Sequence, residues 1–552
     1  MHATNGLFRE QIKIDNNATL KKGPIRSYLK VIIWILIIAA FIGSIFIINF
    51  SFAKNGWSLF FKNWKDFFSP SSFSNLYKEN LFLISIKFLW NSVKIVFLST
   101  TLGLFFAFIT SYFANYKTNS KYIAIPVKIL VIFLRIFPEL FFIYLFKVSF
   151  DKTLSIHFIL TWFTWLWLHE YFSQTIENAN FNIFYHLVKI RNSKFKAFWI
   201  EIWPQIKRKI IGFFFYAFES NLRWATILAQ LGYLGIGILT NPQQEPIEFN
   251  QILIPLLILV IFLVIVEIIS QNINKLFFES KTINEINHKK YKDKKIIKRF
   301  FGWLLIISAL VICGFGIASL VGQKFYASEV SNYFKQMFQA NWSQVHLDLS
   351  QDGIFYILLQ LGALVFVTWV LIYIISYFRI LIMTKSLVGS KISTIIKYTN
   401  MFIRAMPVVT IFLLFSNLFN VYAAGFVVAF AIHGVTSLSR NLAQATNAIS
   451  TEKIYELKKM NYSNFWIYRH YIRPLVRLDF ITLGSFQIEK TIRNFITFGS
   501  LSSSLLGEQA TLNKVKKISD IAPYLWIGMI IIAVVNLVAY LIRVKFTKQK
   551  WI

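Results

Sequence analysis

Two pairs of oppositely charged residues stand four positions apart inside strongly apolar stretches of the chain. Glu219 and Arg223 form one pair, and Glu489 and Arg493 form the other. Residues four apart share one face of a helix, so each pair can form an ion pair. A charged side chain inside a membrane costs about 2.5–3.5 kcal/mol on insertion scales and usually faces a bundle interior or a solute pathway. The pairs are therefore predicted either to fix helix packing or to line a translocation path, where arginine binds anionic groups such as phosphate.

Three further charged residues are candidates for the same path. Arg135 and Glu139 lie in the stretch RIFPELFFIYLF, and Arg404 lies in RAMPVVTIFLLF. We expect them near the internal end of a span, where a long side chain reaches the interface at little cost. His433 stands alone in an apolar stretch and is expected to be a structural group. No HExxH motif or Cys/His cluster occurs, so no metal and no cofactor is predicted.

The composition places these residues in membrane helices. The 552 residues include 58 Lys and Arg against 25 Asp and Glu, a net charge of +33, while 56% are apolar and only 15% are charged. Soluble domains are typically ~45–50% apolar and ~25% charged. The values exclude a soluble enzyme, a disordered chain and a nucleic-acid-binding protein with a basic polar surface. They indicate an all-α polytopic membrane protein.

Apolar stretches of about 20 residues, long enough to cross a membrane as helices, occur in two sets of six. The first set lies near 29–52, 84–114, 123–148, 154–176, 209–239 and 251–276, and the second near 301–322, 354–383, 394–418, 420–446, 478–506 and 521–544. The predicted domains are a cytosolic N-terminal tail at 1–28, a first half at 29–278 with its core at 84–277, a basic cytosolic linker at 279–300, and a second half at 301–552 with its core at 354–545.

The distribution of Lys and Arg predicts the orientation, because these residues collect in cytosolic loops. The N-terminal tail, the segment 185–209, the linker and the C-terminal tail are basic, whereas 240–250 and 341–352 contain neither Lys nor Arg. The loops 54–80 and 507–520 fit less well, because each carries several lysines. The overall alternation predicts a multi-pass protein of the cell membrane with both termini in the cytoplasm.

The two halves repeat one another. The shift that takes Tyr185 to Tyr455 aligns YHLVKIRNSKFKAFWIEIWP with YELKKMNYSNFWIYRHYIRP, and it also aligns the two Glu/Arg pairs. A shift that is shorter by one position aligns RIFPELFFIYLF with RAMPVVTIFLLF. Six spans in each half give both copies the same orientation. The repeat is therefore predicted to be parallel, about an axis near the membrane normal, with a pore between the halves.

The aligned stretches at 185–204 and 455–474 are each predicted to form a short amphipathic helix that ends at a proline in a cytosolic loop. Such a helix can dock its apolar face into a groove on a soluble partner or lie on anionic lipid. Recurrence at the same place in both halves favours docking. The candidate docking residues are Tyr185, Leu187, Ser193, Phe195 and Pro204, and Tyr455, Glu456, Leu457, Ser463, Phe465 and Pro474.

These two stretches resemble the coupling loop of bacterial ABC importer permeases, which seats on the ATPase subunit. The segments HEYFSQTIENAN, FYAFESNLRWATILAQLGYLGIG, RIFPELFFIYLF and VEIISQNINKLF resemble the phosphonate-type permeases. Two such units in one chain look like the fused permease of mycoplasma-type high-affinity transport systems. The resemblance is close over 84–277 and looser over 354–545. The family's Glu position holds Tyr185 and Tyr455, and its Gly position holds Arg191 and Asn461.

The resemblance implies a type I ABC importer permease fold with about 12 transmembrane helices. It implies import of a small solute, anionic and similar to a phosphonate or phosphate ester, by alternating access. Energy would come from two copies of an ABC ATPase subunit, and an extracytoplasmic solute-binding lipoprotein would deliver the solute. The chain itself lacks GxxxxGK[ST] and is not expected to be an enzyme.

Membrane lipid is the other expected contact, and no nucleic acid partner is expected. Two alternatives stay open. A 12-helix secondary transporter driven by an ion gradient would show the same hydropathy, and a membrane scaffold would use the positive charge as a lipid anchor. The repeated coupling-loop stretches argue against both.

Overall fold

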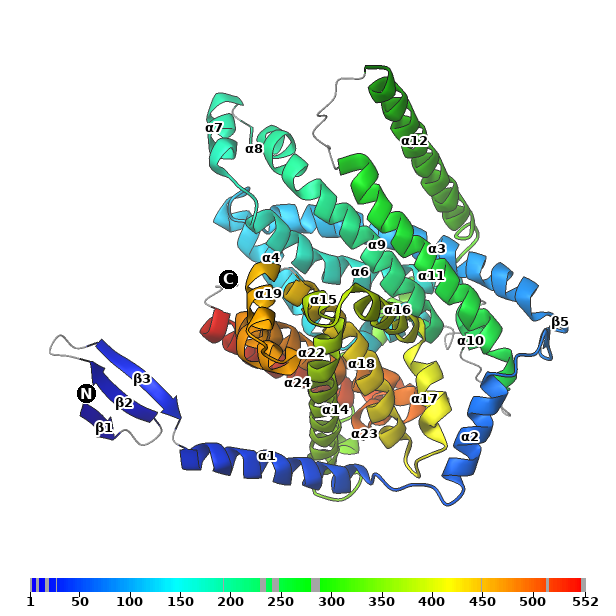
Figure 1. Cartoon of the computed structure of the whole chain (residues 1–552). Helices are drawn as coiled ribbons and strands as arrows, with labels where there is room; N and C mark the ends of the chain where they lie inside the picture. Colours follow the sequence, from blue (N-terminus) through cyan, green and yellow to red (C-terminus); the bar gives the residue numbers. More distant parts are fainter. Residues whose placement is uncertain are drawn as a thin grey trace.

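The structure is a computed structural model that describes residues 2–5, 9–14, 19–25, 27–191, 193–228, 235–240, 248–278, 288–447, 449–512 and 516–547. Helices form most of the described chain, in two successive series that pack together (Figure 1). We call residues 27–278 the first series and residues 288–547 the second series. One large apolar core contains residues of both series.

The longer helices follow one another in the same order in the two series, and the second series has additional short helices, among them α15 (Lys385–Val388) and α21 (Arg473–Leu475). The first series contains α1 (Ser27–Ile48), α2 (Gly56–Phe67), α3 (Leu81–Phe113), α4 (Lys121–Ile136), α5 (Glu139–Ser149), α6 (Lys152–Glu177), α7 (Asn182–Arg191), α8 (Lys194–Ala197), the π-helix η1 (Phe198–Ile202), α9 (Trp203–Leu228), α10 (Ile236–Thr240), the 3₁₀ turn η3 (Phe249–Gln251) and α11 (Leu253–Phe278). The second contains α12 (His288–Ala318), α13 (Ala327–Phe338), the 3₁₀ turn η4 (Trp342–Gln344), α14 (Ile354–Met383), α15 (Lys385–Val388), α16 (Ser390–Ala405), α17 (Val408–Ser416), α18 (Tyr422–Asn447), α19 (Thr451–Lys459), α20 (Asn464–Ile467), the π-helix η5 (Tyr468–Ile472), α21 (Arg473–Leu475), α22 (Arg477–Thr497), the 3₁₀ turn η6 (Phe498–Leu501), α23 (Leu505–Gln509) and α24 (Ile518–Thr547).

The spacing between matching elements agrees with the shift seen in the sequence. Helix α6 runs from Lys152 to Glu177 and α18 from Tyr422 to Asn447, so both ends are displaced by the same amount as Tyr455 is from Tyr185. The pair α20 and η5 follows α8 and η1 at this same distance along the chain. The repeat is therefore visible in the positions of helices as well as in residue identities.

Two predicted spans are broken in the structure. The stretch 123–148 forms α4 and α5, which meet at 89°, and the stretch 394–418 forms α16 and α17, which meet at 84°. A proline stands at each break, Pro138 and Pro407, and the residue before each has an extended backbone. Proline disfavours helical geometry in the residue before it, so the first helix of each pair ends there. The prediction of a continuous span was wrong at both places.

Seven described helices are long and apolar enough to cross a membrane, and nine spans result if each bent pair counts as one. They are built on α1, α3, α11, α12, α14, α18 and α24. The chain is a multi-pass membrane protein. Helices α6, α9 and α22 stand where spans were predicted but are not among these candidates. Charged residues lower the hydropathy of α9 and α22, and His, Thr and Trp residues lower that of α6. The crossing of these three helices stays a prediction.

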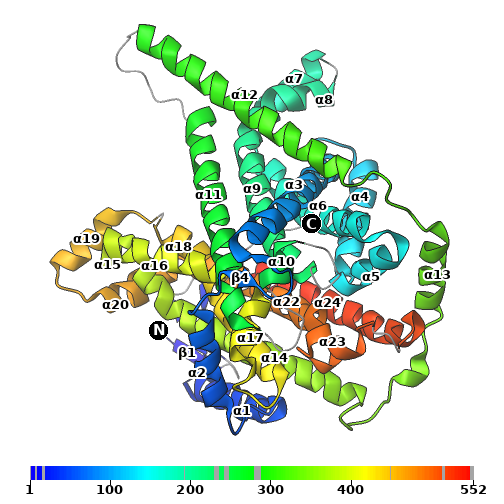
Figure 2. The ribbon, with the colours of Figure 1, turned by 90° about the vertical axis from the view of Figure 1, so that its right-hand side faces the viewer.

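The first helix of each series packs on the other series. Helix α1 lies against α14, and α12 lies against α3 (Figures 1 and 2). Backbone hydrogen bonds from the segments that follow α1 and α12 also join the two series. Ala53 N–H donates to Leu418 O at 3.0 Å, and Tyr326 N–H donates to Ser149 O at 2.8 Å. The two series are thus joined at two places, where α1 packs on α14 and where α12 packs on α3.

Three features of the structure were not predicted from the sequence. The N-terminal tail contains a three-stranded antiparallel sheet of β1 (His2–Asn5), β2 (Arg9–Ile14) and β3 (Thr19–Ile25), which the sequence did not predict. A second, two-stranded sheet pairs β4 (Phe73–Ser74) with β5 (Glu79–Asn80). In the predicted linker, α12 begins at His288 and runs into the apolar span, whereas 279–287 lies outside the described residues.

Candidate functional site

Two hairpins built from α7 to η1 and from α19 to η5 extend from the helical bundle (Figure 2). Each replaces the single amphipathic helix that was predicted. Helix α7 ends at Arg191 and α8 begins at Lys194, so the first stretch is divided between two helices. The prolines do not end these helices: Pro204 is the second residue of α9 and Pro474 lies in α21. The prediction of one helix ending at a proline was wrong in both stretches.

The aligned serines cap the second short helix of each hairpin. Ser193 Oγ accepts a hydrogen bond from Lys196 N–H at 3.4 Å, and Ser463 Oγ accepts one from Trp466 N–H at 3.2 Å. Serine is favoured at this position because its oxygen satisfies an amide that the helix leaves unpaired. The two serines therefore have a structural role in shaping the hairpins.

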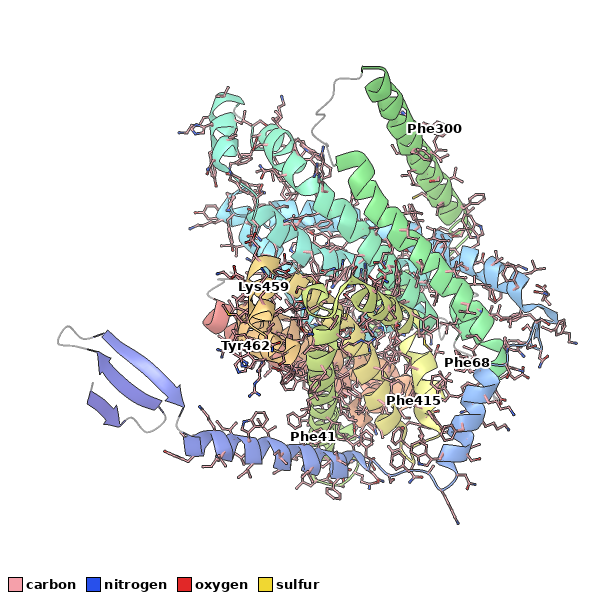
Figure 3. All side chains as sticks on the ribbon, viewed as in Figure 1. Phe41, Phe68, Phe300, Phe415, Lys459 and Tyr462 are labelled. Carbon is pink, nitrogen blue, oxygen red and sulfur yellow. The ribbon has the colours of Figure 1, made fainter. Side chains whose placement is uncertain are left out.

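Each hairpin buries one set of aromatic and aliphatic side chains and exposes another. Phe198 and Tyr468 stand at matching positions and are fully buried in two small cores, in which Leu187 and Leu457 are partly buried. The remaining candidate docking residues are exposed: Tyr185, Phe195, Pro204, Tyr455, Glu456, Phe465 and Pro474. Figure 3 marks Lys459 and Tyr462 on the outer part of the second hairpin. Both hairpins thus present aromatic residues that the bundle leaves uncovered.

The first predicted Glu/Arg pair contacts a helix break of the second series. Arg223 Nη2 lies 3.6 Å from Glu219 Oε1, and Arg404 Nη2 also pairs with Glu219 Oε1. Arg223 Nη1 donates to the backbone oxygen of Arg404 at 3.2 Å. Helix α16 ends next to Arg404, and the last carbonyls of a helix have no partner within it. Arg223 supplies one of the missing donors.

The second Glu/Arg pair makes the corresponding contact with the first series. Arg493 Nη2 lies 3.2 Å from Glu489 Oε1 and donates to the backbone oxygen of Arg135 at 2.7 Å. Arg493 Nη1 also lies 3.6 Å from Glu139 Oε1. The side chains of Arg493, Glu489 and Glu139 are at most 17% exposed. The structure thus brings the predicted path residues together as two ion clusters, each of which joins the two series.

The side chain of Arg135 departs from this symmetry. It pairs with Glu170 of its own series, with Nη1 at 2.8 Å from Oε2, whereas Arg404 pairs with a glutamate of the opposite series. Arg440 occupies the position in the second series that corresponds to Glu170, and it pairs with Glu267 at 3.4 Å. Glu170, Glu267 and Arg440 were not among the site residues predicted from the sequence. The rule that ionisable residues in spans are functional candidates would have identified all three.

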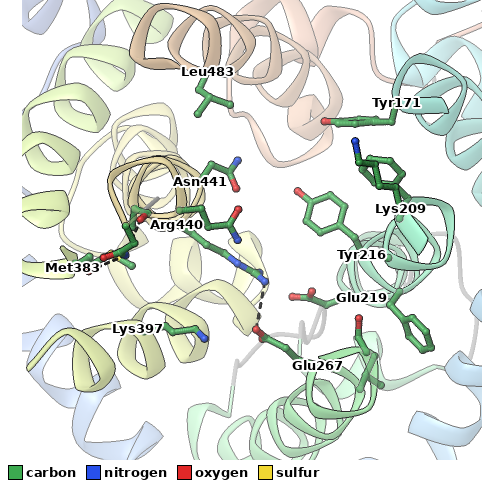
Figure 4. A pocket seen from close by; sticks show the side chains of 18 of the residues that line it. Tyr171, Lys209, Tyr216, Glu219, Glu267, Met383, Lys397, Arg440, Asn441 and Leu483 are labelled. Atoms are coloured by element: carbon green, nitrogen blue, oxygen red, sulfur yellow. Dashed lines mark hydrogen bonds and ion pairs between the residues drawn. The ribbon is translucent and has the colours of Figure 1, made fainter. Parts of the chain in front are cut away.

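A cavity of about 1030 Å³ lies between the two series (Figure 4). Glu219, Lys397 and Arg440 project into it, and Arg440 is held there by Glu267. Its cationic lining groups outnumber the anionic ones, four to two. The lining residues are Tyr171, Lys209, Gly212, Phe213, Phe215, Tyr216, Glu219, Val266, Glu267, Ser270, Met383, Lys385, Ser393, Lys397, Arg440, Asn441, Ala443, Gln444, Asn447 and Leu483. This size and mixture of apolar and polar groups are typical of a site for a small molecule.

Within the described ranges, no group of three or more His, Cys, Asp or Glu residues is placed to hold a metal ion. The cavity and the ion clusters present charged and hydrogen-bonding side chains. Arginine and lysine in a partly dry site favour binding of carboxylate, phosphate or phosphonate groups.

Comparison with known proteins finds two similar curated proteins. The chain is 28% identical over 493 residues to the ABC transport system permease protein p69 of Mycoplasma genitalium, covering 88% of each chain. It is 29% identical over 483 residues to the ABC transport system permease protein p69 of Mycoplasma pneumoniae, covering 84% of each chain. No family model and no solved structure matches the chain. The names of both relatives support the prediction of an ABC transport permease, and neither name specifies a solute.

Proposed function

We propose that the chain is the permease subunit of an ABC importer that carries a small anionic solute across the cell membrane. The observation that carries the proposal is the pair of hairpins of like construction, α7 to η1 and α19 to η5, each with an exposed phenylalanine at the same position. Two equivalent docking elements suit a partner present in two copies, and a dimer of ATPase subunits is such a partner. The names of the two relatives give independent support. The chain is then a transport subunit, and ATP hydrolysis takes place on the partner chains.

The proposed topology has 12 spans, with α6, α9 and α22 crossing the membrane along with the more apolar helices. Both hairpins and both termini lie in the cytoplasm, as the basic loops indicate. The domains are those expected from the sequence: the tail at 1–28, the halves at 29–278 and 301–552, and the linker at 279–300. The halves form a parallel repeat of the type I ABC importer permease kind, with the path between them.

The proposed mechanism uses the two ion clusters as the contacts that change between states. ATP binding draws the ATPase subunits and both hairpins together, and the helices that follow the hairpins, α9 and α22, carry Glu219 and Arg493. These residues contact the helix breaks of the opposite series, so their movement changes the spacing between the halves. The cavity is the inward-open part of the path. An extracytoplasmic lipoprotein delivers a phosphonate- or phosphate-ester-like solute from the other side.

Isolation of the tagged chain from its own membranes in mild detergent, with mass spectrometry of bound proteins, tests the proposal. Recovery of a P-loop ATPase at two copies per chain, with or without a lipoprotein, supports the importer. Isolation of the chain alone, from membranes in which a second multi-subunit complex stays intact, contradicts it. Uptake that then follows an ion gradient would establish the alternative, a secondary transporter.

A further inference from the structure

Lys490 is an accessible lysine in the interior of the bundle. It lies on α22, directly after Glu489, and its side chain is exposed. Arg223, Arg404 and His433 all lie within electrostatic range of it. These residues come from α9, α16 and α18, so the accessible surface of Lys490 faces the space that these helices enclose. Lysine on the lipid-facing side would not meet three such neighbours.

Helices α18 and α22 run from this space to the cavity of about 1030 Å³, with the same face toward both. Leu483 lines the cavity and precedes Lys490 by seven residues on α22, and Arg440 lines it and follows His433 by seven on α18. Seven residues make two turns, so each pair shares a helix face over about 10 Å. Glu219 also lines the cavity while it pairs with Arg404. The group around Lys490 therefore lies at one end of the cavity.

This group carries more positive than negative charge. Arg223 and Arg404 share the carboxylate of Glu219. Among the described residues, Lys490 has no hydrogen bond or ion pair within the chain, and its charge adds to those of Arg223 and Arg404. Uncompensated charge in a membrane interior is costly unless a ligand or water offsets it. The first series has Ser220 at the position that corresponds to Lys490. This additional positive charge is therefore contributed by the second series alone.

We propose that Lys490 and Arg223 bind an oxyanion, a phosphate, phosphonate or carboxylate group, at the end of the cavity between the two series. Arg404 is held by Glu219 and positions Arg223 through its backbone oxygen. That this oxyanion belongs to the transported solute rests on the proposed function. Because only one side of the repeat carries the lysine, the site binds one oxyanion per chain and fixes which end of the solute faces α22.

The test uses one cysteine beside Lys490 and inorganic phosphate as the probe. Cys313 is the single cysteine, so Cys313→Ser with Phe486→Cys places one thiol on α22 between Leu483 and Lys490. The full chain, in nanodiscs of neutral phosphatidylcholine, is labelled with a negatively charged methanethiosulfonate reagent at constant ionic strength. Phosphate at ten times its Kd is expected to slow labelling by about ten-fold.

Three variants decide the role of Lys490. Lys490→Gln is expected to raise the phosphate concentration needed for protection by about ten-fold, because a charge-assisted contact is lost. Lys490→Arg keeps the charge and is expected to keep protection. Lys62→Gln makes the same change of charge on the distant helix α2 and is the matched control. Absence of protection in the chain with Lys490, or equal protection with Lys490→Gln, overturns the site.

A second set of nanodiscs containing phosphatidylglycerol distinguishes a solute site from a lipid site. Protection by this lipid without added phosphate would identify a lipid headgroup as the occupant and overturn the solute-binding role. The labelling needs neither ATP nor a partner chain. Failure of ATP-driven uptake in the isolated complex would therefore contradict the proposed function alone, while the phosphate result decides the oxyanion site.

Discussion

Arg493 Nη2 donates a 2.7 Å hydrogen bond to the backbone oxygen of Arg135, which is 358 positions earlier in the chain. Arg223 makes the matching bond to the backbone oxygen of Arg404. Each arginine thereby binds the open end of a helix that proline has interrupted. The two proline breaks and the two Glu/Arg pairs are thus parts of one arrangement, and neither half of the chain contains a complete copy of it.

Arg493→Gln is expected to destabilise the folded chain, by up to about 3 kcal/mol, because it leaves the partly buried carboxylates of Glu139 and Glu489 without this cation. The measurement is thermal unfolding of the purified chain in detergent. Arg477→Gln, at the exposed start of the same helix, is the matched control and should leave the midpoint unchanged. An equal midpoint for both variants would show that the second ion cluster does not hold the series together.

Replacing Phe195 and Phe465 by Asp is expected to abolish ATP-driven uptake while the chain still inserts into the membrane. Both rings are exposed, at 58% and 45%, so the bundle does not need them for folding. A carboxylate in an apolar docking groove would be costly. The double change to Leu keeps an apolar contact and serves as the control. Normal uptake by the Asp variant would contradict the docking role of the hairpins.

Ser193→Ala together with Ser463→Ala is expected to loosen both hairpins, since loss of a helix cap costs about 1 kcal/mol at each site. Hydrogen exchange of the amides in α8 and α20 is the measurement, and the amides of Lys196 and Trp466 should exchange faster. Ser390→Ala at the start of α16 is the comparison, because Ser390 makes no capping contact in the described structure. Unchanged exchange in both hairpins would contradict the capping role.

Gly499→Ala is expected to prevent normal packing of η6 against α23. A methyl group at this position would lie 1.9 Å from the backbone of Gly507, far closer than atoms can approach. Gly484→Ala on α22 is the control, because nothing lies within 4 Å of the added carbon. The yield of monodisperse protein after extraction distinguishes them: Gly499→Ala should lower it strongly and Gly484→Ala should not.

Asp151 makes the contact between the loop after α5 and the loop after α12 sensitive to acid. Its carboxylate accepts hydrogen bonds from Lys324 N–H at 2.8 Å and from the Tyr326 hydroxyl at 2.9 Å, and these bonds lower the pKa of Asp151 below its ordinary value. Because the folded pKa is the lower one, the stabilisation is complete above the unfolded pKa and is lost as the pH falls through the folded value.

Hydrogen exchange at the Lys324 amide, followed as the pH is lowered below the ordinary pKa of an aspartate, measures this effect. After correction for intrinsic exchange, protection should fall with pH in the wild-type chain. Asp151→Asn keeps an acceptor oxygen but cannot titrate, so its protection should be independent of pH. A parallel fall in both proteins would show that another group controls the contact.

Much of the fold follows from hydropathy and from the repeat. The stretch 354–383 was predicted as a span, and α14 has the same bounds, because this long and mostly apolar stretch lies between Asp352–Gly353 and Thr384–Lys385. The bends at Pro138 and Pro407 were not predicted, although each proline was visible in the sequence. Proline in a membrane helix is often accommodated by neighbouring groups, so its presence alone does not decide between a kink and a break.

The sequence predicted the Glu/Arg pair of each ion cluster but not its third partner. The i, i+4 spacing correctly paired Glu219 with Arg223 and Glu489 with Arg493. The third partner of each cluster depends on which series packs against which, and the sequence has no local signal for that. Arg135 shows the limit most clearly: by symmetry it should match Arg404, yet Glu170 of α6 is closer and determines its pairing.

The packing of α1 and α12 on opposite series has a consequence for biosynthesis. Helix α1 ends at Ile48 and its partner α14 begins at Ile354, so the ribosome must make all of the intervening chain before α1 can find its place. At about 5–20 residues per second, that takes about 15–60 s. Helix α12 has no such delay, because α3 is already in the bilayer when it emerges. Apart from Lys30 near its start, the exposed surface of α1 is mostly apolar, which suits a helix that stays in lipid until α14 has been made. The two corresponding contacts, α1 with α14 and α12 with α3, therefore form at different times during synthesis.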